Sequence, residues 1–294
     1  MNVTQRRFGI GEWFGQPLLS LTPAHRSQLA RCALQELESP RCPFQKPSTP
    51  CSKRGGVCSI QQYESSADGR IRAAIGQPVV VCPRRFEESR TLLRWLAEIV
   101  GLDPNDTHVA REVPFMRGTR TQRPAGKIDL VVAGLGEPSF RWYGLEIQAV
   151  YFSGQGMSDE FERLTNDESD SPPFPDAVRR PDWRSSSAKR LMPQLEIKVP
   201  TLRRWASKLA VAVDRPFFDS MGGSSANPTQ DLDDGDIIWL VPELRASGDE
   251  LLRMTRGHWE VLTLEQSRAK LLAAETISRS DFETTLKQKL QPLD

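Results

Sequence analysis

Two acids and one amide lie in apolar surroundings within residues 127–152. Asp129 sits inside one apolar run, and Glu146 and Gln148 alternate with apolar residues in a second run. Side chains alternate between faces along a strand, so Glu146 and Gln148 must point to the same side of a sheet. Carboxylate oxygens are hard ligands that suit magnesium. The stretch therefore predicts a metal-dependent hydrolytic site built on a hairpin.

The two apolar runs must pair with each other for such a site to form. A tight turn centred on Glu137-Pro138 would place Asp129 directly opposite Glu146, with Cβ atoms about 4.5–5.5 Å apart. Two opposed carboxylates repel each other and lose hydration, and a divalent cation removes this penalty. The alternative is a pair of ordinary strands whose acids face water.

The hairpin needs further elements to hold it. The apolar face of residues 89–101 predicts a helix with Ser89 as its N-cap. The strand that precedes the hairpin carries Glu112. Two helices are expected at the end of the chain, because their starts fit capping boxes, Thr263 with Gln266 and Ser280 with Glu283. Apolar runs predict further strands at residues 109–115, 209–214, 236–242 and 258–264. We therefore expect an α/β (α+β) fold.

A second candidate site lies upstream, where four cysteines follow the spacing Cys-x8-Cys-x6-Cys-x23-Cys. In a chain without an export signal, clustered cysteines are more often metal ligands than disulfides. Four thiolates suit a tetrahedral zinc or iron ion, which would hold together a loop region with few apolar residues. Free structural thiols are the alternative. The four residues are Cys42, Cys51, Cys58 and Cys82, whereas Cys32 lies on the apolar face of a predicted helix and is expected in the core.

Basic residues are segregated along the chain, although the net charge is only +1. Residues 179–208 hold nine basic residues against two acidic ones, and Arg outnumbers Lys 30 to 9 in the whole chain. Arg suits two-pronged bonding to phosphate and to guanine edges, and a local basic surface can bind nucleic acid on a neutral protein. Ordinary solvated faces are the alternative. The candidate ligands of double-stranded DNA are Arg117, Arg120, Arg123, Arg184, Lys189, Arg190, Arg203 and Arg204.

The chain is expected to have two parts. Residues 1–85 would form an arm, a helix and the cysteine metal-binding module, and residues 86–294 a catalytic and DNA-binding domain. The first residues, MNVTQRRFGIGEWFG, lack the apolar core of a signal peptide. No apolar run reaches the roughly 18 residues that a membrane span needs. We therefore expect a cytoplasmic protein without a membrane anchor.

The order of these elements resembles the PD-(D/E)XK nuclease core, a helix followed by three strands, a helix and a strand. The second strand carries an acid and the third carries Glu-x-Gln. With four upstream cysteines and the FGIGEWFG segment, the chain resembles the NotI type of type II restriction endonuclease. GKIDLVV, GLEIQAVYFSG and the segment that runs to TLRRW also carry this resemblance. It implies a central mixed sheet flanked by helices, with an N-terminal four-cysteine metal-binding module.

The resemblance also assigns roles to residues. Asp129 and Glu146 would hold magnesium at the scissile phosphate. Gln148 would stand where many relatives have Lys, and a neutral amide can orient water but cannot lower its pKa by charge. Glu112 matches an auxiliary acid in position and could equally be a surface glutamate. The ion at the four cysteines would be structural, with iron as a candidate where the sequence alone suggests zinc.

Another pair of motifs matches the nuclease consensus more literally. Pro181-Asp182 is followed by Glu196-Ile197-Lys198. We favour the hairpin, because Asp182 lies among arginines and serines with no apolar alternation. The gap between Asp182 and Glu196 also contains no tight turn. The segment is better interpreted as DNA-contacting.

The leading hypothesis is a type II site-specific endonuclease that makes magnesium-dependent double-strand breaks. A palindromic target cut on both strands requires two active sites and hence a homodimer. Arg abundance favours G·C-rich targets. A repair or junction nuclease on the same core would instead recognise DNA structure, and a non-enzymatic, metal-stapled DNA-binding protein would not cleave at all.

Overall fold

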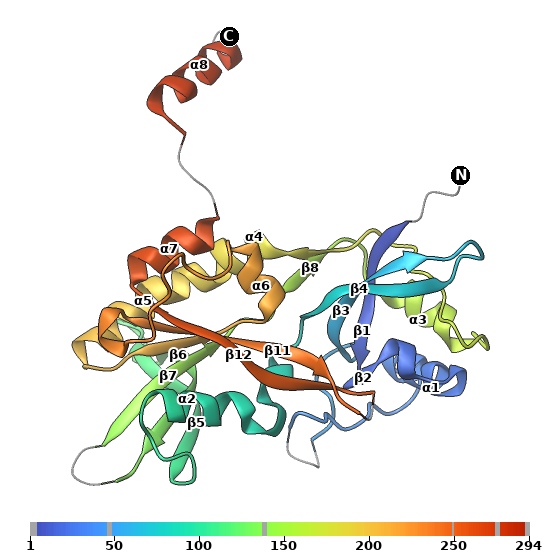
Figure 1. Ribbon diagram of the computed structural model, residues 1–294, viewed down its shortest axis with the longest axis horizontal. Coiled ribbons are helices and arrows are strands. Elements are labelled where there is room, and N and C mark those ends of the chain that lie inside the picture. The colour runs from blue at the N-terminus through green and yellow to red at the C-terminus, as the bar shows by residue number, and fades with distance from the viewer. Residues whose placement is uncertain (1–4, 46–48, 137–139, 249, 274–276, 292–294) are drawn as a thin grey trace.

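The protein is built on two main sheets that lie side by side (Figure 1). A four-stranded sheet with α1 and α3 nearby forms the right-hand part of the view, and a six-stranded sheet forms the left-hand part. The turn expected at Glu137-Pro138 lies outside the described residues. The computed structural model describes residues 5–45, 49–136, 140–248, 250–273 and 277–291.

The four-stranded sheet has the order β2-β1-β3-β4 and is antiparallel. This corrects the expectation that residues 40–83 form a loop region. Ile60, Tyr63 and Val79 face the core from β3 and β4, so apolar burial helps to hold this hairpin. The strands are β1 (Arg6–Trp13), β2 (Gln16–Pro17), β3 (Val57–Ser65) and β4 (Ile71–Val80).

The six-stranded sheet has the order β12-β11-β10-β7-β6-β5. Strands β7, β10 and β11 are parallel to one another, whereas β5–β6, β6–β7 and β11–β12 are antiparallel pairs. The predicted α+β fold with a central mixed sheet is therefore confirmed. The strands are β5 (Thr107–Arg117), β6 (Pro124–Gly134), β7 (Arg141–Ile147), β10 (Leu209–Ala212), β11 (Ile237–Ala246) and β12 (Leu252–Leu262).

Helices cover both faces of this sheet. In Figure 1, α5 (Met192–Arg204) and α7 (Leu264–Leu272) lie above the strands and α2 (Thr91–Ile99) lies below them. The start of α2 differs from the prediction, because Arg90 rather than Ser89 occupies the N-cap position, without a side-chain cap bond. The remaining elements are α1 (Pro23–Ala33), α3 (Ser158–Thr165), β8 (Tyr151–Ser153), β9 (Arg180–Asp182), α4 (Trp183–Ser186), a π-helical turn (Ser187–Leu191), α6 (Arg215–Ser220) and α8 (Arg279–Lys289), with short 3-10 segments at Leu18–Ser20, Pro83–Arg90 and Leu232–Asp234.

The two C-terminal helices test the capping predictions. Thr263 and Gln266 form the predicted capping box of α7. Helix α8 begins two residues earlier than predicted, with Ser278 as the N-cap. No residue of α8 is buried, and the helix stands apart from both sheets (Figure 1). Among the described residues, no helix is long and apolar enough to cross a membrane.

A buried arginine joins the two sheets. The Arg85 guanidinium donates to both Glu12 oxygens on β1 at 3.0 Å and to Glu88 at 2.7 Å. It also donates to the Leu252 carbonyl of β12 at 2.9 Å. Arg85 and Glu12 are completely buried. Removing one partner would leave an uncompensated buried charge, which typically costs about 3–5 kcal/mol.

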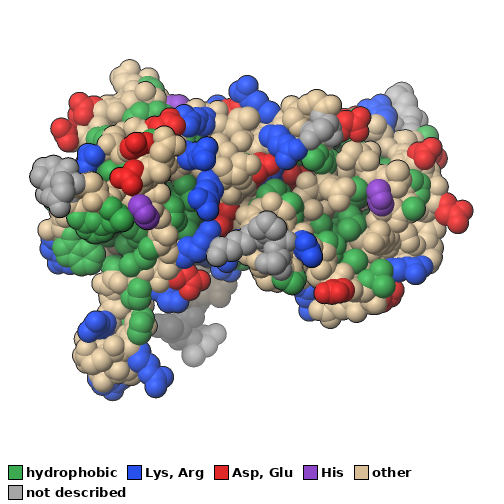
Figure 2. Space-filling view, turned by 90° about the horizontal axis from the view of Figure 1, so that it is seen from below, with side chains coloured by type: hydrophobic (Ala, Val, Ile, Leu, Met, Phe, Trp, Pro, Cys, Tyr) green, Lys and Arg blue, Asp and Glu red, His purple; other side chains and the backbone are tan. Residues whose placement is uncertain are grey.

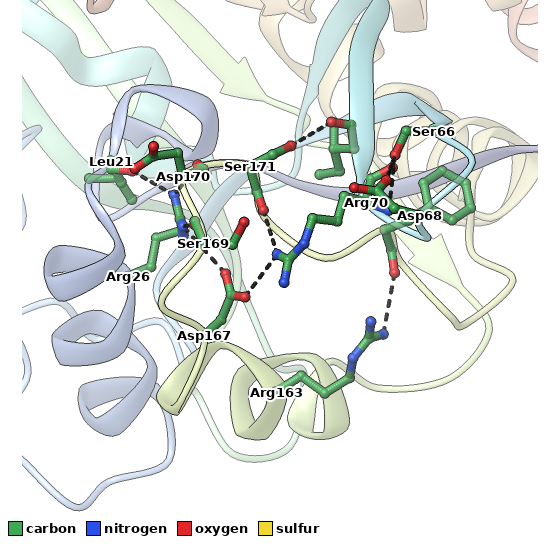
Figure 3. Close-up of polar contacts among 12 residues, drawn as sticks. Leu21, Arg26, Ser66, Asp68, Arg70, Arg163, Asp167, Ser169, Asp170 and Ser171 are labelled. Carbon is green, nitrogen blue, oxygen red and sulfur yellow. Dashed lines mark hydrogen bonds and ion pairs between the residues drawn. The ribbon is translucent and has the colours of Figure 1, made fainter.

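A second polar network fastens the segment after α3 to the N-terminal sheet. Figure 3 shows the Asp167 carboxylate between two guanidinium groups, 3.3 Å from Arg26 and 2.8 Å from Arg70. Arg70 also donates to the Ser171 carbonyl at 2.6 Å. These contacts explain how a polar segment with little secondary structure keeps a defined path.

A third link is made by a buried acid. Asp214, just after β10, accepts from the backbone N–H of Val80 on β4 at 2.5 Å and from that of Phe217 on α6 at 3.0 Å. Besides burial, the main influences on its ionisation are backbone hydrogen bonds and the nearby Asp219 charge. Burial raises the pKa of Asp214 from 3.8 to about 7, even though its backbone hydrogen bonds act in the opposite direction.

Asp214 should therefore make stability depend on pH. Its folded-state pKa lies above the unfolded value, so this contribution is complete below pH 3.8 and is lost as pH rises to about 7. The full loss is on the order of 4 kcal/mol. Urea unfolding should show that the free energy of unfolding of the wild type falls relative to that of Asp214→Asn as pH rises through this range. If the difference in unfolding free energy between the two proteins does not change with pH, Asp214 is charged over this whole pH range in the folded protein.

Candidate active site

Strand pairing brings the two predicted acids together. Leu130 pairs with Leu145, and the next pair in this register is Asp129 with Glu146. The Asp129 N–H donates to Glu146 Oε1 at 3.3 Å, and the Ile147 N–H donates to Asp129 Oδ2 at 3.2 Å. Each carboxylate thus accepts a hydrogen bond from the neighbouring strand. The two side chains lie on one face of the sheet, as the alternation of residues predicts.

The two acids lie in different environments. Asp129 is exposed, whereas Glu146 is only 2% exposed. Burial and then the nearby Asp129 charge raise the pKa of Glu146 from 4.5 to about 7, while Lys198 acts in the opposite direction. A perturbed acid beside a second acid is typical of functional sites. The pair offers hard oxygen ligands that a divalent cation would stabilise.

Lys198 is the site residue that sequence reasoning missed. It lies on α5, is only 5% exposed, and its Nζ is 2.5 Å from Glu146 Oε2. The sequence contains a signal for this position. Leu195, Val199 and Leu202 are spaced as on one side of a helix, and the structure buries all three. The helical period places Lys198 on the same face, toward the sheet. Lys198 is also the last residue of the rival motif Glu196-Ile197-Lys198.

Gln148 lies just beyond the end of β7. Its backbone N–H donates to the Ala212 carbonyl at 3.0 Å, and its side-chain amide donates to the Ala149 carbonyl at 2.6 Å. The side chain lines a pocket of about 440 Å³ between the N-terminal part and the central sheet. The pocket is lined by Lys53, Val81, Pro83, Ile147, Gln148, Ala149, Val150, Tyr151, Arg190 and Gln194.

Glu112 lies on the edge strand β5 in a left-handed backbone conformation, with φ of 50°. The residues on either side of it pair with the residues on either side of Asp129, so Glu112 stands across from Asp129 in the strand alignment. Its carboxylate is exposed and lies 2.9 Å from Lys127 Nζ. The ion pair with Lys127 lowers the pKa of Glu112.

The predicted DNA ligands fall into three places. Arg117, Arg120 and Arg123 are exposed at the turn between β5 and β6. The second group, Arg184, Lys189 and Arg190, is exposed in the segment before α5, where the Arg190 guanidinium stacks 3.6 Å above the centre of the Tyr151 ring. The third group, Arg203 and Arg204, lies at the opposite end of α5, and Arg203 pairs with Asp236 at 2.6 Å.

The rival motif is divided between separate places. Asp182 caps α4 by accepting from the Ser185 N–H at 3.0 Å. Glu196 lies on the outer side of α5 and contacts Arg268 of α7 at 3.6 Å. Of its motif residues, Lys198 is the one that contacts Glu146.

The four predicted metal-binding cysteines pack into one cluster. Cys42, Cys58 and Cys82 are buried together with Phe44, and Cys51 packs against them. Burial raises the pKa values of the Cys51 and Cys58 thiols. Within the described ranges, no group of three or more His, Cys, Asp or Glu residues is arranged to hold a metal ion. Cys32 lies in the main core as predicted.

Comparison with known proteins identifies the family. A family model described as restriction endonuclease NotI matches residues 24–252, which is more than three quarters of the chain. A search of curated proteins found no match. The matched region contains the acid pair, Lys198 and the four clustered cysteines. The chain therefore belongs to the NotI restriction endonuclease family and is a type II site-specific restriction endonuclease, a hydrolase that acts on double-stranded DNA.

Proposed function

We propose that this endonuclease hydrolyses phosphodiester bonds at a magnesium site formed by Asp129 and Glu146. The observation that carries this proposal is the buried Glu146 carboxylate, which the exposed Asp129 carboxylate faces across the β6–β7 pair. Bound magnesium would polarise a phosphoryl oxygen and help to generate hydroxide. Side chains of the protein itself would orient the attacking water and bind the DNA phosphate.

The order of elements supports a PD-(D/E)XK-type core. Helix α2 precedes the antiparallel strands β5, β6 and β7, and α5 then leads to β10, which lies parallel to β7. The acids lie on the second and third of these strands. The residues that follow β7, Gln148 to Tyr151, line the pocket beside this strand end, and a DNA phosphate would approach the acid pair from there.

Three polar side chains would complete the site. Gln148 lines the pocket next to the acid pair and would orient the attacking water. Glu112 stands across from Asp129 in the strand alignment and would serve as an auxiliary acid once its ion pair with Lys127 opens. Arg190 lines the same pocket and would bind a phosphate while its guanidinium remains stacked on Tyr151.

Basic surfaces supply the longer-range attraction to DNA. Figure 2 shows Lys and Arg side chains gathered beside the hollow between the two parts of the molecule. The exposed arginines of the β5–β6 turn and the basic segment before α5 would add contacts to phosphates or guanine edges. We propose Arg117, Arg120, Arg123, Arg184, Lys189, Arg190, Arg203 and Arg204 as these ligands.

We propose a G·C-rich palindromic target and a homodimer that cuts both strands. Each active site cuts one strand, so a symmetric target requires a second copy. A hydrophobic groove of about 400 Å³ on β5, β6 and β7 offers a contact surface, with Leu135, Phe140 and Trp205 exposed at it. Arg prevalence favours guanine contacts.

The cysteine cluster would hold a structural iron or zinc ion. It would belong to an N-terminal module formed by residues 1–85, and residues 86–294 would form the catalytic domain. The clustering of four thiols supports this proposal, because thiolates suit both metals. A bound cation would also favour the thiolate form that burial otherwise opposes.

Alanine substitutions separate the acid pair from the rival motif. Asp129→Ala should reduce magnesium-dependent plasmid cleavage by at least about 100-fold, since losing only a supporting partner of a metal ligand can have an effect of that size. Asp182→Ala should retain cleavage and lose roughly 1 kcal/mol of stability with the α4 cap. Cleavage by Asp129→Ala together with inactivity of a folded Asp182→Ala would contradict the proposed site.

Elemental analysis tests the cysteine module. The purified wild type should contain about one iron or zinc ion per chain. Cys58→Ser should lose the metal and unfold at a lower temperature. The matched control is Cys32→Ala, a buried cysteine outside the cluster, which should keep the metal. Wild-type protein that folds without metal would exclude a required structural ion.

Mapping of DNA ends tests specificity. Incubation with a large sequenced DNA and magnesium should give discrete, reproducible fragments. Their ends should share one palindromic, G·C-rich sequence, because the arginine-rich surface favours guanine. Ends that share an A·T-rich or asymmetric sequence would contradict the proposed target.

A further inference from the structure

A lysine without a role in the mechanism above lies against the acid pair. The Nζ atom of Lys198 is 2.5 Å from Glu146 Oε2 and 2.8 Å from Gln194 Oε1. The side chain is only 5% exposed. Its ammonium thus bonds to a proposed metal ligand on one side and to a pocket-lining amide on the other.

The packing of α5 fixes this position. Leu195, Val199 and Leu202 bury the same side of the helix, and Leu202 lies against Gly144 of β7. A Cβ atom at Gly144 would lie 3.3 Å from the Leu202 side chain, so the helix approaches the strand closely next to Glu146. Lys198 is therefore directed at Glu146 by the core rather than by a flexible surface segment.

Lys198 supplies the positive charge next to the buried Glu146 carboxylate. Gln148 brings no charge to the end of β7, although it occupies the position where the family resemblance expects a lysine. Among the described residues, Lys198 is the one cation within ion-pair distance of Glu146. A buried carboxylate beside a second carboxylate needs such a partner, because an unpaired buried charge is strongly destabilising. Lys198 supplies this positive charge from α5.

We propose that Lys198 is a positioning residue that exchanges partners when metal binds. It holds Glu146 in place in the metal-free protein, releases this carboxylate to the metal, and stays bonded to Gln194. Gln194 lines the pocket, so the exchange moves the ammonium toward the place where a DNA phosphate would lie. This inference rests on the proposed function of Asp129 and Glu146.

The first test replaces the ammonium with an apolar side chain of similar length. Ca²⁺ serves as a non-cleaving probe, and calorimetry measures its binding. Lys198→Met should bind Ca²⁺ at least about tenfold more tightly than the wild type, because the positive charge that competes with the ion is gone. The magnesium-dependent kcat should fall by roughly 100-fold with little change in KM for DNA. Its thermal stability should rise more on Ca²⁺ addition than that of the wild type.

The second test keeps the lysine and removes its other partner. Gln194→Leu leaves the ammonium with Glu146 alone, so Ca²⁺ binding should weaken by several-fold while kcat also falls. A purely structural role would lower thermal stability in both variants without moving Ca²⁺ affinity in opposite directions. This variant also keeps the proposal testable if Lys198→Met does not fold.

A matched control separates charge loss from the specific site. Lys208 is half-buried and donates to the Gly235 carbonyl at 2.6 Å, so Lys208→Met removes a similar lysine from a neutral partner. It should leave Ca²⁺ affinity and kcat unchanged. If Asp129→Ala is inactive and both Lys198→Met and Gln194→Leu match the wild type, the exchange is overturned and the active site stands. If Asp129→Ala still cleaves, the proposed function itself fails.

Discussion

A buried carboxylate that faces a second carboxylate on the adjacent strand is stabilised by a nearby positive charge, and the central sheet is arranged around this constraint. The β6–β7 register sets Asp129 across from Glu146, and burial of Glu146 makes the repulsion stronger than it would be in water. Helix α5 then supplies Lys198 from above the sheet. Lys198 reaches Glu146 because α5 packs on β10 and on Gly144 of β7 through its apolar face. The arrangement suits a site that is completed by a divalent cation.

Much of this site could be predicted from the sequence because its causes are local. Alternating apolar residues predicted β6 and β7, and a turn centred on Glu137-Pro138 predicted the register that sets Asp129 across from Glu146. Continuous apolar runs found β10 and β11, which are buried on both faces as parallel strands are. Thr263 and Gln266 marked the start of α7, since a capping box involves only neighbouring residues.

The features that could not be predicted depend on distant partners. Strands β3 and β4 were expected to belong to a loop region because residues 40–83 contain few apolar residues, yet pairing with β1 and burial of Tyr63 stabilise them. Arg90 rather than Ser89 occupies the N-cap position of α2, because the 3-10 segment Pro83–Arg90 runs directly into the helix and both residues adopt left-handed backbone conformations. The helical spacing of Leu195, Val199 and Leu202 places Lys198 on the sheet-facing side of α5, but its contact with Glu146 depends on how α5 packs on the sheet, which no short motif encodes.

The buried contacts of Arg85 with Glu12, Glu88 and Leu252 oppose separation of the chain into two fragments. Its guanidinium lies above the Phe44 ring, next to the cysteine cluster, and bonds to β1 and β12 at opposite ends of the sequence. The proposed boundary between the two parts falls at this residue. A catalytic fragment excised there would lose the Arg85 guanidinium, which lies 2.7 Å from the buried Glu88 carboxylate, and would keep the more distant Arg253 guanidinium at 3.6 Å.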